Sequence, residues 1–160
     1  MRPSNIDPLL FSKKEPDRKE CIGLLKEHLN SFPSDTKSWY DLACCNDFLG
    51  QESEAEPAYQ AAQASGIEHL SIEDQRGFYV GLGSTLRNIG KLDESFDLLQ
   101  QGIKIFPDYL ALRVFLGFTL HSMSRYKEAS RELLTMSSLL PNAVLDGYER
   151  AAVFYAKQLD

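Results

Sequence analysis

A block of about 34 residues recurs along this chain, and no other feature of the sequence limits its possible folds as strongly. Gly83 and Pro107 recur one block later as Gly117 and Pro141. Repeats of about 20 to 50 residues are typical of solenoids, in which each unit buries its apolar side only by packing on the next unit. The sequence therefore predicts a stacked array of similar units.

An earlier copy precedes these two at a longer spacing. Ala43 and Ala55 take the places of Gly83 and Ser95, and the offset between these positions exceeds one block by six. Six extra residues therefore separate these copies, and we place them within 66–75. The predicted organisation is an arm at 1–16, a half-repeat at 17–33 that ends with a proline, repeats at 36–69, 76–109 and 110–143, and a capping helix at 144–159.

Each copy has the pattern of two helices. Apolar residues recur at spacings of three and four, as in Phe78, Leu82 and Leu86, which is the period of an amphipathic helix. Gly50 and Gly90 stand where the first helix of a copy must end, and glycine tolerates the left-handed backbone of such a turn. We expect the next copies to begin at the residues after the closing prolines, which favour helix starts: Ser34, Asp108 and Asn142.

Small residues at matching positions predict close contact between the two helices of a copy. The pairs are Ala43 with Ala55, Gly83 with Ser95, and Gly117 with Ala129. Antiparallel helices that cross at about 20° approach most closely at one point, and a small side chain on each helix permits that approach.

This spacing resembles the tetratricopeptide repeat, whose pattern places Trp, Leu-Gly, Tyr, Ala, Phe and Pro at fixed offsets. The matching residues are Trp39, Leu42, Ala55 and Tyr59 in the first copy, Leu82, Gly83, Leu99 and Pro107 in the second, and Leu116, Gly117, Ala129 and Pro141 in the third. The resemblance implies an all-α fold of about eight helices in antiparallel pairs, wound into a right-handed superhelix whose first helices line a concave face. The runs GLGSTLRNIGKLDESFDLLQ and YERAAVFYAKQLD look like a family of small bacterial tetratricopeptide proteins of unknown function, whose members are thought to be dimers.

By the same resemblance, an outward stripe on the first helices forms a groove for a protein or peptide. The candidate residues are Tyr40, Cys44, Asp47, Phe48, Val80, Ser84, Arg87, Val114, Phe118 and His121. A peptide or an amphipathic helix suits so apolar a groove, although the same spacing also suits ordinary core packing. Arg87 either binds a carboxylate of the partner or pairs with Asp47, and the internal pair is favoured. The Lys and Asn residues with which one variant of this fold clamps chaperone tails are missing from the stripe.

The last helix predicts self-association. A terminal helix of a repeat array needs a polar outer face, yet this one is apolar on two sides. The candidate contacts for a homodimer are Leu145, Tyr148, Ala152, Tyr155 and Leu159. One apolar side can cover the third repeat, and the other predicts an interface because exposed apolar patches tend to be interaction sites.

The segment 1–14 lacks clear helical periodicity, which favours a disordered tail. Docking of Ile6, Leu9, Leu10 and Phe11 into a groove is the alternative. The same segment does not resemble a signal peptide, because Asp7 and Pro8 interrupt its apolar residues.

The charges, the apolar runs and the cysteines of the sequence limit the partners and the compartment that we expect. Residues 1–75 carry 7 basic and 14 acidic side chains, and residues 76–160 carry 10 and 9. This balance argues against nucleic acid and favours a basic partner at the acidic end, if it is more than a solvated surface. No apolar run is long enough to span a membrane. Three cysteines with no paired spacing favour the cytoplasm over a disulfide framework.

No motif for a metal, a cofactor or a reaction is present. Cys44-Cys45 are adjacent, so both cannot easily hold one ion, and no histidine pair has metal-ligand spacing. A nucleophilic pair of Cys44 with His121 has no local support. We therefore expect a non-catalytic interaction module without cofactors. A sensor that binds a peptide in the groove is the alternative, and an enzyme subunit is less favoured.

Overall fold

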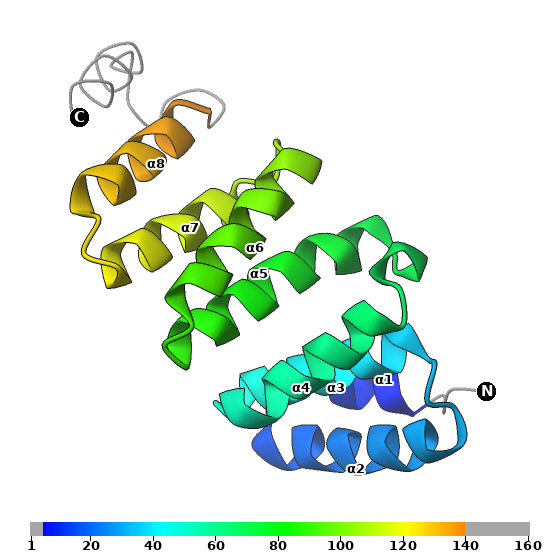
Figure 1. Ribbon diagram of the computed structural model, residues 1–160. Helices are drawn as coiled ribbons and strands as arrows, with labels where there is room; N and C mark the ends of the chain where they lie inside the picture. Colours follow the sequence, from blue (N-terminus) through cyan, green and yellow to red (C-terminus); the bar gives the residue numbers. More distant parts are fainter. Residues whose placement is uncertain (1–4, 140–160) are drawn as a thin grey trace.

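The computed structural model describes residues 5–139 and leaves 1–4 and 140–160 undescribed. Within that part the chain consists of helices and turns (Figure 1). The helices are α1 (Ile6–Leu10), α2 (Glu15–Ser31), α3 (Thr36–Phe48), α4 (Glu52–Ala64), the 3-10 turn η1 (Ile67–His69), α5 (Ile72–Asn88), α6 (Leu92–Ile105), α7 (Ala111–Ser122) and α8 (Tyr126–Leu139).

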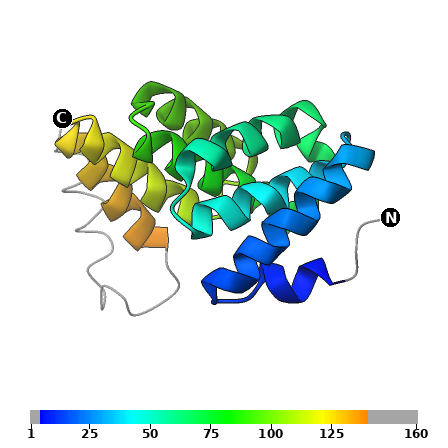
Figure 2. The ribbon, with the colours of Figure 1, turned by 90° about the horizontal axis from the view of Figure 1, so that it is seen from below.

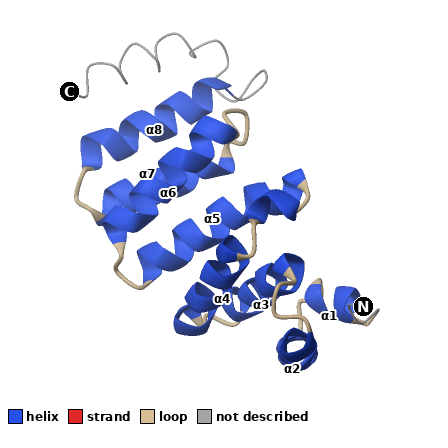
Figure 3. Cartoon of the chain, turned by 45° about the vertical axis from the view of Figure 1, so that its right-hand side comes forward, coloured by secondary structure: helices blue, strands red, loops and turns tan. Residues whose placement is uncertain are grey.

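The helices pack in adjacent pairs, which confirms the predicted all-α architecture. α3 packs on α4, α5 on α6, and α7 on α8, and each pair packs on the next (Figures 1 and 3). The helices α2 to α8 are seven of the expected eight. The eighth would occupy residues 144–159, which lie outside the described residues. The helix α1 was not expected.

The predicted small-residue pairs lie where the helices of a pair meet. The Ser95 hydroxyl donates a 2.7 Å hydrogen bond to the Gly83 carbonyl oxygen. A Cβ atom at Gly83 would come within 2.7 Å of the Leu99 side chain. Ala43 and Ala55 are fully buried. Larger side chains would push these helices apart, because packed interiors leave no space for added atoms.

The turns inside the pairs share one backbone conformation. Gly50 and Gly90 have positive φ values of 66° and 83°, so the expected left-handed turns are confirmed. The third pair uses a different residue at the matching position, because Ser124 has φ 60° there.

Two expected helix starts are wrong. The Asp35 carboxylate, not Ser34, caps α3 by accepting a 3.2 Å hydrogen bond from the Ser38 backbone N–H. α7 begins at Ala111 without a side-chain cap rather than at Asp108. Because Tyr109 and Leu110 form a turn first, the helix starts later than the proline suggests. Asn142 lies outside the described residues.

The six inserted residues lengthen the connection and the helix after it. Gly66 adopts a positive φ of 93° and leads into η1. Ser71 then caps α5 by accepting a hydrogen bond from the Asp74 N–H. The insertion therefore adds a turn and extends α5 at its N-terminus, so that α5 reaches further toward α1.

The N-terminal segment is folded, and the disordered tail expected there is wrong for residues 6–10. Ile6 and Leu10 are buried, and the Cys21 thiol of α2 lies 3.9 Å from the Ile6 carbonyl oxygen. Ile6 and Leu10 precede Tyr40 and Cys44 by one repeat length. The short helix α1 thus stands in sequence where the first helix of an incomplete repeat would stand, and it packs on α2 (Figure 2).

Candidate protein-binding groove

The first helices of the three pairs, α3, α5 and α7, lie beside one another in chain order (Figure 3). Two large aromatic side chains on these helices remain exposed. Phe48 on α3 is 44% exposed, and Phe118 on α7 is 45% exposed. An arginine covers each ring, because the Arg18 guanidinium lies 4.4 Å from the Phe48 ring centre and that of Arg87 lies 5.9 Å from the Phe118 ring centre.

Two glycines of α5 give the tyrosines of the first repeat their positions. A Cβ atom at Gly77 would collide with the Tyr40 hydroxyl, and one at Gly81 would collide with the Tyr59 hydroxyl. Tyr40 and Tyr59 are both buried. The candidate residue Tyr40 is therefore mainly a packing residue, and its hydroxyl lies at the contact between α3 and α5.

Asp47 holds three helices together. Its carboxylate accepts hydrogen bonds of 2.7 Å from the Tyr59 hydroxyl on α4 and 2.6 Å from the Thr85 hydroxyl on α5. Burial raises the pKa of Asp47 above its ordinary value, although both hydrogen bonds oppose the shift. Such a carboxylate serves the fold, because each of its oxygens already accepts a hydrogen bond from a buried hydroxyl.

The favoured ion pair between Asp47 and Arg87 is wrong. The Arg87 Nη2 atom donates a 2.9 Å hydrogen bond to the Asn88 side chain, and the guanidinium lies against Phe118. Thr85, two residues earlier on α5, takes the place beside Asp47 that we expected Arg87 to take. Arg87 and Phe118 are therefore brought together, and Asp47 is not part of that cluster.

The remaining candidates differ in exposure. Val80, Ser84 and Val114 are half-buried, and Val80 packs against the core. His121 is exposed, and its ring lies 5.1 Å from that of Tyr126. The residues predicted for self-association, Leu145, Tyr148, Ala152, Tyr155 and Leu159, lie outside the described residues.

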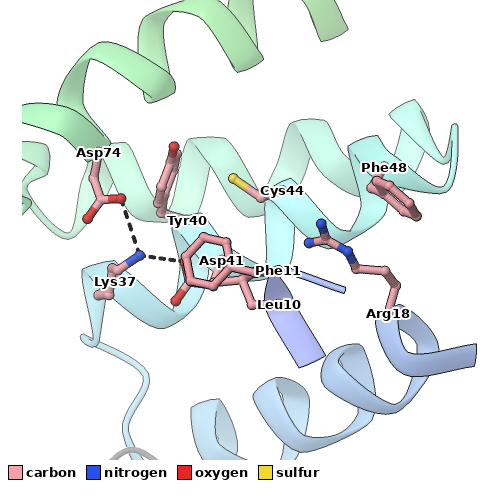
Figure 4. Close-up of a pocket in the computed structure, with 9 residues that line it drawn as sticks. All are labelled: Leu10, Phe11, Arg18, Lys37, Tyr40, Asp41, Cys44, Phe48 and Asp74. Carbon is pink, nitrogen blue, oxygen red and sulfur yellow. Dashed lines mark hydrogen bonds and ion pairs between the residues drawn. The ribbon is translucent and has the colours of Figure 1, made fainter. Parts of the chain in front are cut away.

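A pocket of about 260 Å³ opens between α1, α3 and the start of α5 (Figure 4). Its lining includes the predicted residues Tyr40, Cys44 and Phe48. It also includes Leu10 and Phe11, whose docking into a groove was the alternative for the N-terminal segment. Lys37 lies at the start of the same stripe on α3, and three lining residues were missed by the prediction: Arg18, Asp41 and Asp74. The offset of one repeat length from Ile6 and Leu10 to Tyr40 and Cys44 could have placed α1 beside α3 from the sequence.

Lys37 joins α3 to α5 at the edge of this pocket. Its ammonium donates to Asp41 at 2.7 Å and to Asp74 at 3.3 Å. Burial disfavours the charge on Lys37, but the two carboxylates outweigh burial and raise its pKa above the ordinary value. Lys37 therefore stays charged, and its charge is shared between two acids.

The repeat seen in the structure agrees with the protein family whose sequence pattern this chain matches. The sequence model described as Tetratrico peptide repeat matches residues 36–159. The chain belongs to the tetratricopeptide repeat family. This membership supports a protein–protein interaction module. It leaves the narrower resemblance to small bacterial tetratricopeptide proteins as an expectation.

The tetratricopeptide region also has a distant relative. A stretch of 79 residues is 31% identical to Protein O-mannosyl-transferase Tmtc3 of Drosophila melanogaster. The match covers 49% of this chain and 8% of that protein. The chain therefore spans a small part of that relative, and a match of this extent does not carry over the transferase activity in its name.

The groups that an enzyme would need have separate partners in the tetratricopeptide groove. The Cys44 sulfur lies 3.9 Å from the Tyr59 hydroxyl, whereas His121 contacts Tyr126. Burial raises the pKa of Cys44 to about 12, so its thiol is protonated at neutral pH and is a weak nucleophile. The tetratricopeptide family is typically non-catalytic, and these contacts give the alternative of an enzyme no support.

The described residues also bear on metal binding and on membrane insertion. Between residues 5 and 139, no three His, Cys, Asp or Glu side chains gather in a way that could hold a metal ion. Across the same residues, each helix is too short or too polar to cross a lipid bilayer.

Proposed function

We propose that this chain is a non-catalytic interaction module that binds a short segment of a partner protein in the groove formed by α3, α5 and α7. The observation that carries this proposal is the exposure of Phe48 and Phe118 on those helices. Exposed aromatic rings are typical of interface centres, because they bury a large area with little loss of side-chain freedom.

The covering arginines strengthen this interpretation. A guanidinium over a ring is a contact that a partner can extend, since the free edges of Arg18 and Arg87 can still donate hydrogen bonds. The Nε atom of Arg87 is buried without a partner among the described residues. A carboxylate or carbonyl oxygen of a bound peptide would satisfy this part of the groove.

Capture of partners by variant proteins tests the proposal. The double substitution Phe48→Ala and Phe118→Ala removes the two exposed rings and leaves the buried core intact. We prefer it to a substitution of Tyr40, which is buried and supports the fold. Mass spectrometry of proteins captured from the native cell should lose its specific partners with the double variant and retain them with Ile105→Ala, an equally exposed apolar residue on α6. Unchanged capture by a folded double variant would move the binding site away from the groove.

Self-association through residues 145–159 remains part of the proposal. Its support is the apolar pattern of Leu145, Tyr148, Ala152, Tyr155 and Leu159. Light scattering at high micromolar protein tests it, and a monomer mass would end it. The alternative of a sensor requires a groove that stays open in the dimer, because a groove filled by the second copy would leave no place for a peptide. The free thiols of Cys21, Cys44 and Cys45 support the cytoplasm as the compartment.

A further inference from the structure

The pocket between α1 and α3 has an apolar interior beside two exposed aromatic rings. Leu10, Tyr40 and Cys44 line it, and Phe11 and Phe48 flank it (Figure 4). Phe11 is 77% exposed, which is unusual for an isolated phenylalanine beside a pocket. Small-molecule sites enclose about 300 to 1,000 Å³. A pocket of about 260 Å³ is better matched to one or two side chains of a peptide.

An adjoining hollow of about 500 Å³ is lined by acidic residues. It shares Tyr40, Phe11 and Lys37 with the pocket and adds Glu73 at the start of α5. Asp74 lies on the wall common to both, and Asp7 also lines the hollow. A cation would find the carboxylates of Glu73 and Asp74 within one cavity. One Asp74 oxygen accepts from Lys37 and the other accepts a 2.9 Å hydrogen bond from the Ser71 hydroxyl, so Glu73 would be the main partner of the cation.

The balance of charge in the two cavities favours a cation in the bound segment. The two linings contain two cations, Arg18 in the pocket and Lys37 in both cavities, and four carboxylates. The Lys37 ammonium is already held by Asp41 and Asp74. Glu73 then adds a further carboxylate, and it is exposed at the rim. An anionic side chain placed there would face like charges, which weakens binding.

The two cavities share part of their lining, so neighbouring side chains of one ligand can occupy both. Tyr40, Leu10 and Phe11 line both cavities, so one ligand can fill both without a gap. In an extended segment, residues two apart point to the same side. An apolar residue and a basic residue two positions later would therefore reach the pocket and the hollow together.

We propose that this end of the groove binds an extended segment of a partner protein in which an aromatic or large apolar residue is followed, two positions later, by lysine or arginine. The inference rests on the proposed function and specifies its partner. The apolar side chain enters between Phe11 and Phe48. The basic side chain pairs with Glu73 and Asp74.

Two synthetic peptides test the chemistry. They are seven-residue alanine peptides with blocked ends that contain Phe-Ala-Lys or Phe-Ala-Glu at the centre. Each is titrated into the full chain labelled with 15N, and amide shifts report both affinity and location. The lysine peptide should bind with a Kd of about 1 mM or tighter and shift amides of α1, α3 and the start of α5. The glutamate peptide should bind at least about tenfold more weakly, because its charge faces Glu73 and Asp74.

Single substitutions at exposed positions test the assignment of each cavity. Phe11→Ala and Glu73→Gln should each weaken the lysine peptide about fivefold or more. Their matched controls on α6, Ile105→Ala and Glu94→Gln, should leave the Kd within twofold, since both residues are also exposed. Equal binding of the two peptides, or an unchanged Kd in Phe11→Ala and Glu73→Gln, would overturn the proposal.

Other outcomes separate this inference from the proposed function. If the lysine peptide shifts amides around Phe118 instead, the groove binds peptides but the assigned end is wrong. If the same amides of α1 and α3 shift on concentrating the protein alone, a second copy occupies the pocket and the inference fails. If neither peptide binds while partner capture still depends on Phe48 and Phe118, the proposed function stands without this inference.

Discussion

The Thr85 hydroxyl on α5 donates a 2.6 Å hydrogen bond to the Asp47 carboxylate on α3. The Tyr59 hydroxyl of α4 occupies the other carboxylate oxygen at 2.7 Å. One acidic side chain thereby joins the first repeat to the second, at the level of the groove. The relative positions of the helices that carry Phe48 and Phe118 depend on such contacts, because repeats of this kind are held only by their neighbours.

Removal of the Asp47 side chain should destabilise the fold. Asp47→Ala removes the oxygen acceptor of the buried Tyr59 hydroxyl, whereas the Thr85 hydroxyl can still donate to the Gly81 carbonyl oxygen at 3.0 Å. The loss should be about 2 kcal/mol. Asp47→Asn retains an acceptor of similar shape and should cost less than about 1 kcal/mol at neutral pH. Urea denaturation measures both. Equal losses for the two variants would contradict this expectation, because they would show that an acceptor of similar shape cannot replace the carboxylate.

The contribution of Asp47 to the stability of the fold should change with pH in a definite direction. Burial raises its pKa in the folded protein, so the folded state binds the proton more tightly than the unfolded chain. Its contribution to stability therefore increases as pH falls from neutral through the raised pKa, and it is complete below the ordinary value. The stability of the wild type relative to Asp47→Asn should increase between about pH 7 and about pH 4. A relative stability that decreases over this range would contradict the raised pKa.

The contact between Gly81 and Tyr59 predicts the effect of a single methyl group. Gly81→Ala should lower the free energy of unfolding by about 1 to 3 kcal/mol, because the added Cβ atom collides with the Tyr59 hydroxyl. Gly23→Ala is the matched control, since the space around Gly23 in α2 is open. It should raise stability by up to about 1 kcal/mol, because alanine favours helix.

A double-mutant cycle tests the cause of that loss. Tyr59→Phe removes the hydroxyl oxygen that Gly81→Ala would strike, and it leaves the ring carbon Cζ at 2.8 Å from the added Cβ atom, so the collision is relieved in part. The double variant should therefore be more stable than the sum of the two single losses implies. Strict additivity would place the collision elsewhere.

Periodicity predicts much of this fold because the packing in each repeat depends on residues close in sequence. Gly83 and Ser95 stand on consecutive helices and meet directly, as their pattern indicates. Helix α1 is too short to show helical periodicity, and its only signal in the sequence is the offset of one repeat length from Ile6 and Leu10 to Tyr40 and Cys44. It is stabilised by burial of Ile6 and Leu10 against the rest of the fold, a tertiary effect that local propensity does not report.

The groove was less predictable than the fold. Helical spacing identifies the face of α3 that carries Tyr40, Cys44 and Phe48. It does not determine the rotamer of a long side chain nearby, such as that of Arg87. Arg87 could reach either Asp47 or Phe118, and the choice depends on the position of α7 relative to α5. The acidic hollow depends on Asp74, which the insertion after the first repeat places opposite Lys37. The periodicity of apolar residues carries no information about this ion pair between Lys37 and Asp74.

The turn at Ser124 offers a stabilising substitution. Ser124 has a left-handed φ of 60°, where Gly50 and Gly90 occur in the other pairs. A residue with a Cβ atom is strained by roughly 1 kcal/mol or more in this conformation. Ser124→Gly should raise the free energy of unfolding by about 1 kcal/mol, and Gly90→Ser should lower it by a similar amount. Urea denaturation of both variants checks the prediction, and a loss of stability in Ser124→Gly would contradict it.

The reactivity of Cys44 distinguishes a structural thiol from a nucleophile. Because burial raises its pKa to about 12, only a minute fraction is thiolate at neutral pH. The greater nucleophilicity of the thiolate offsets part of this deficit, so alkylation of Cys44 by iodoacetamide should be roughly a hundredfold slower than that of free cysteine. Peptide mapping by mass spectrometry separates Cys44 from Cys21 and Cys45, which are fully buried and shielded. Alkylation of Cys44 faster than free cysteine would revive the alternative of an enzyme, because activated thiols react in that way.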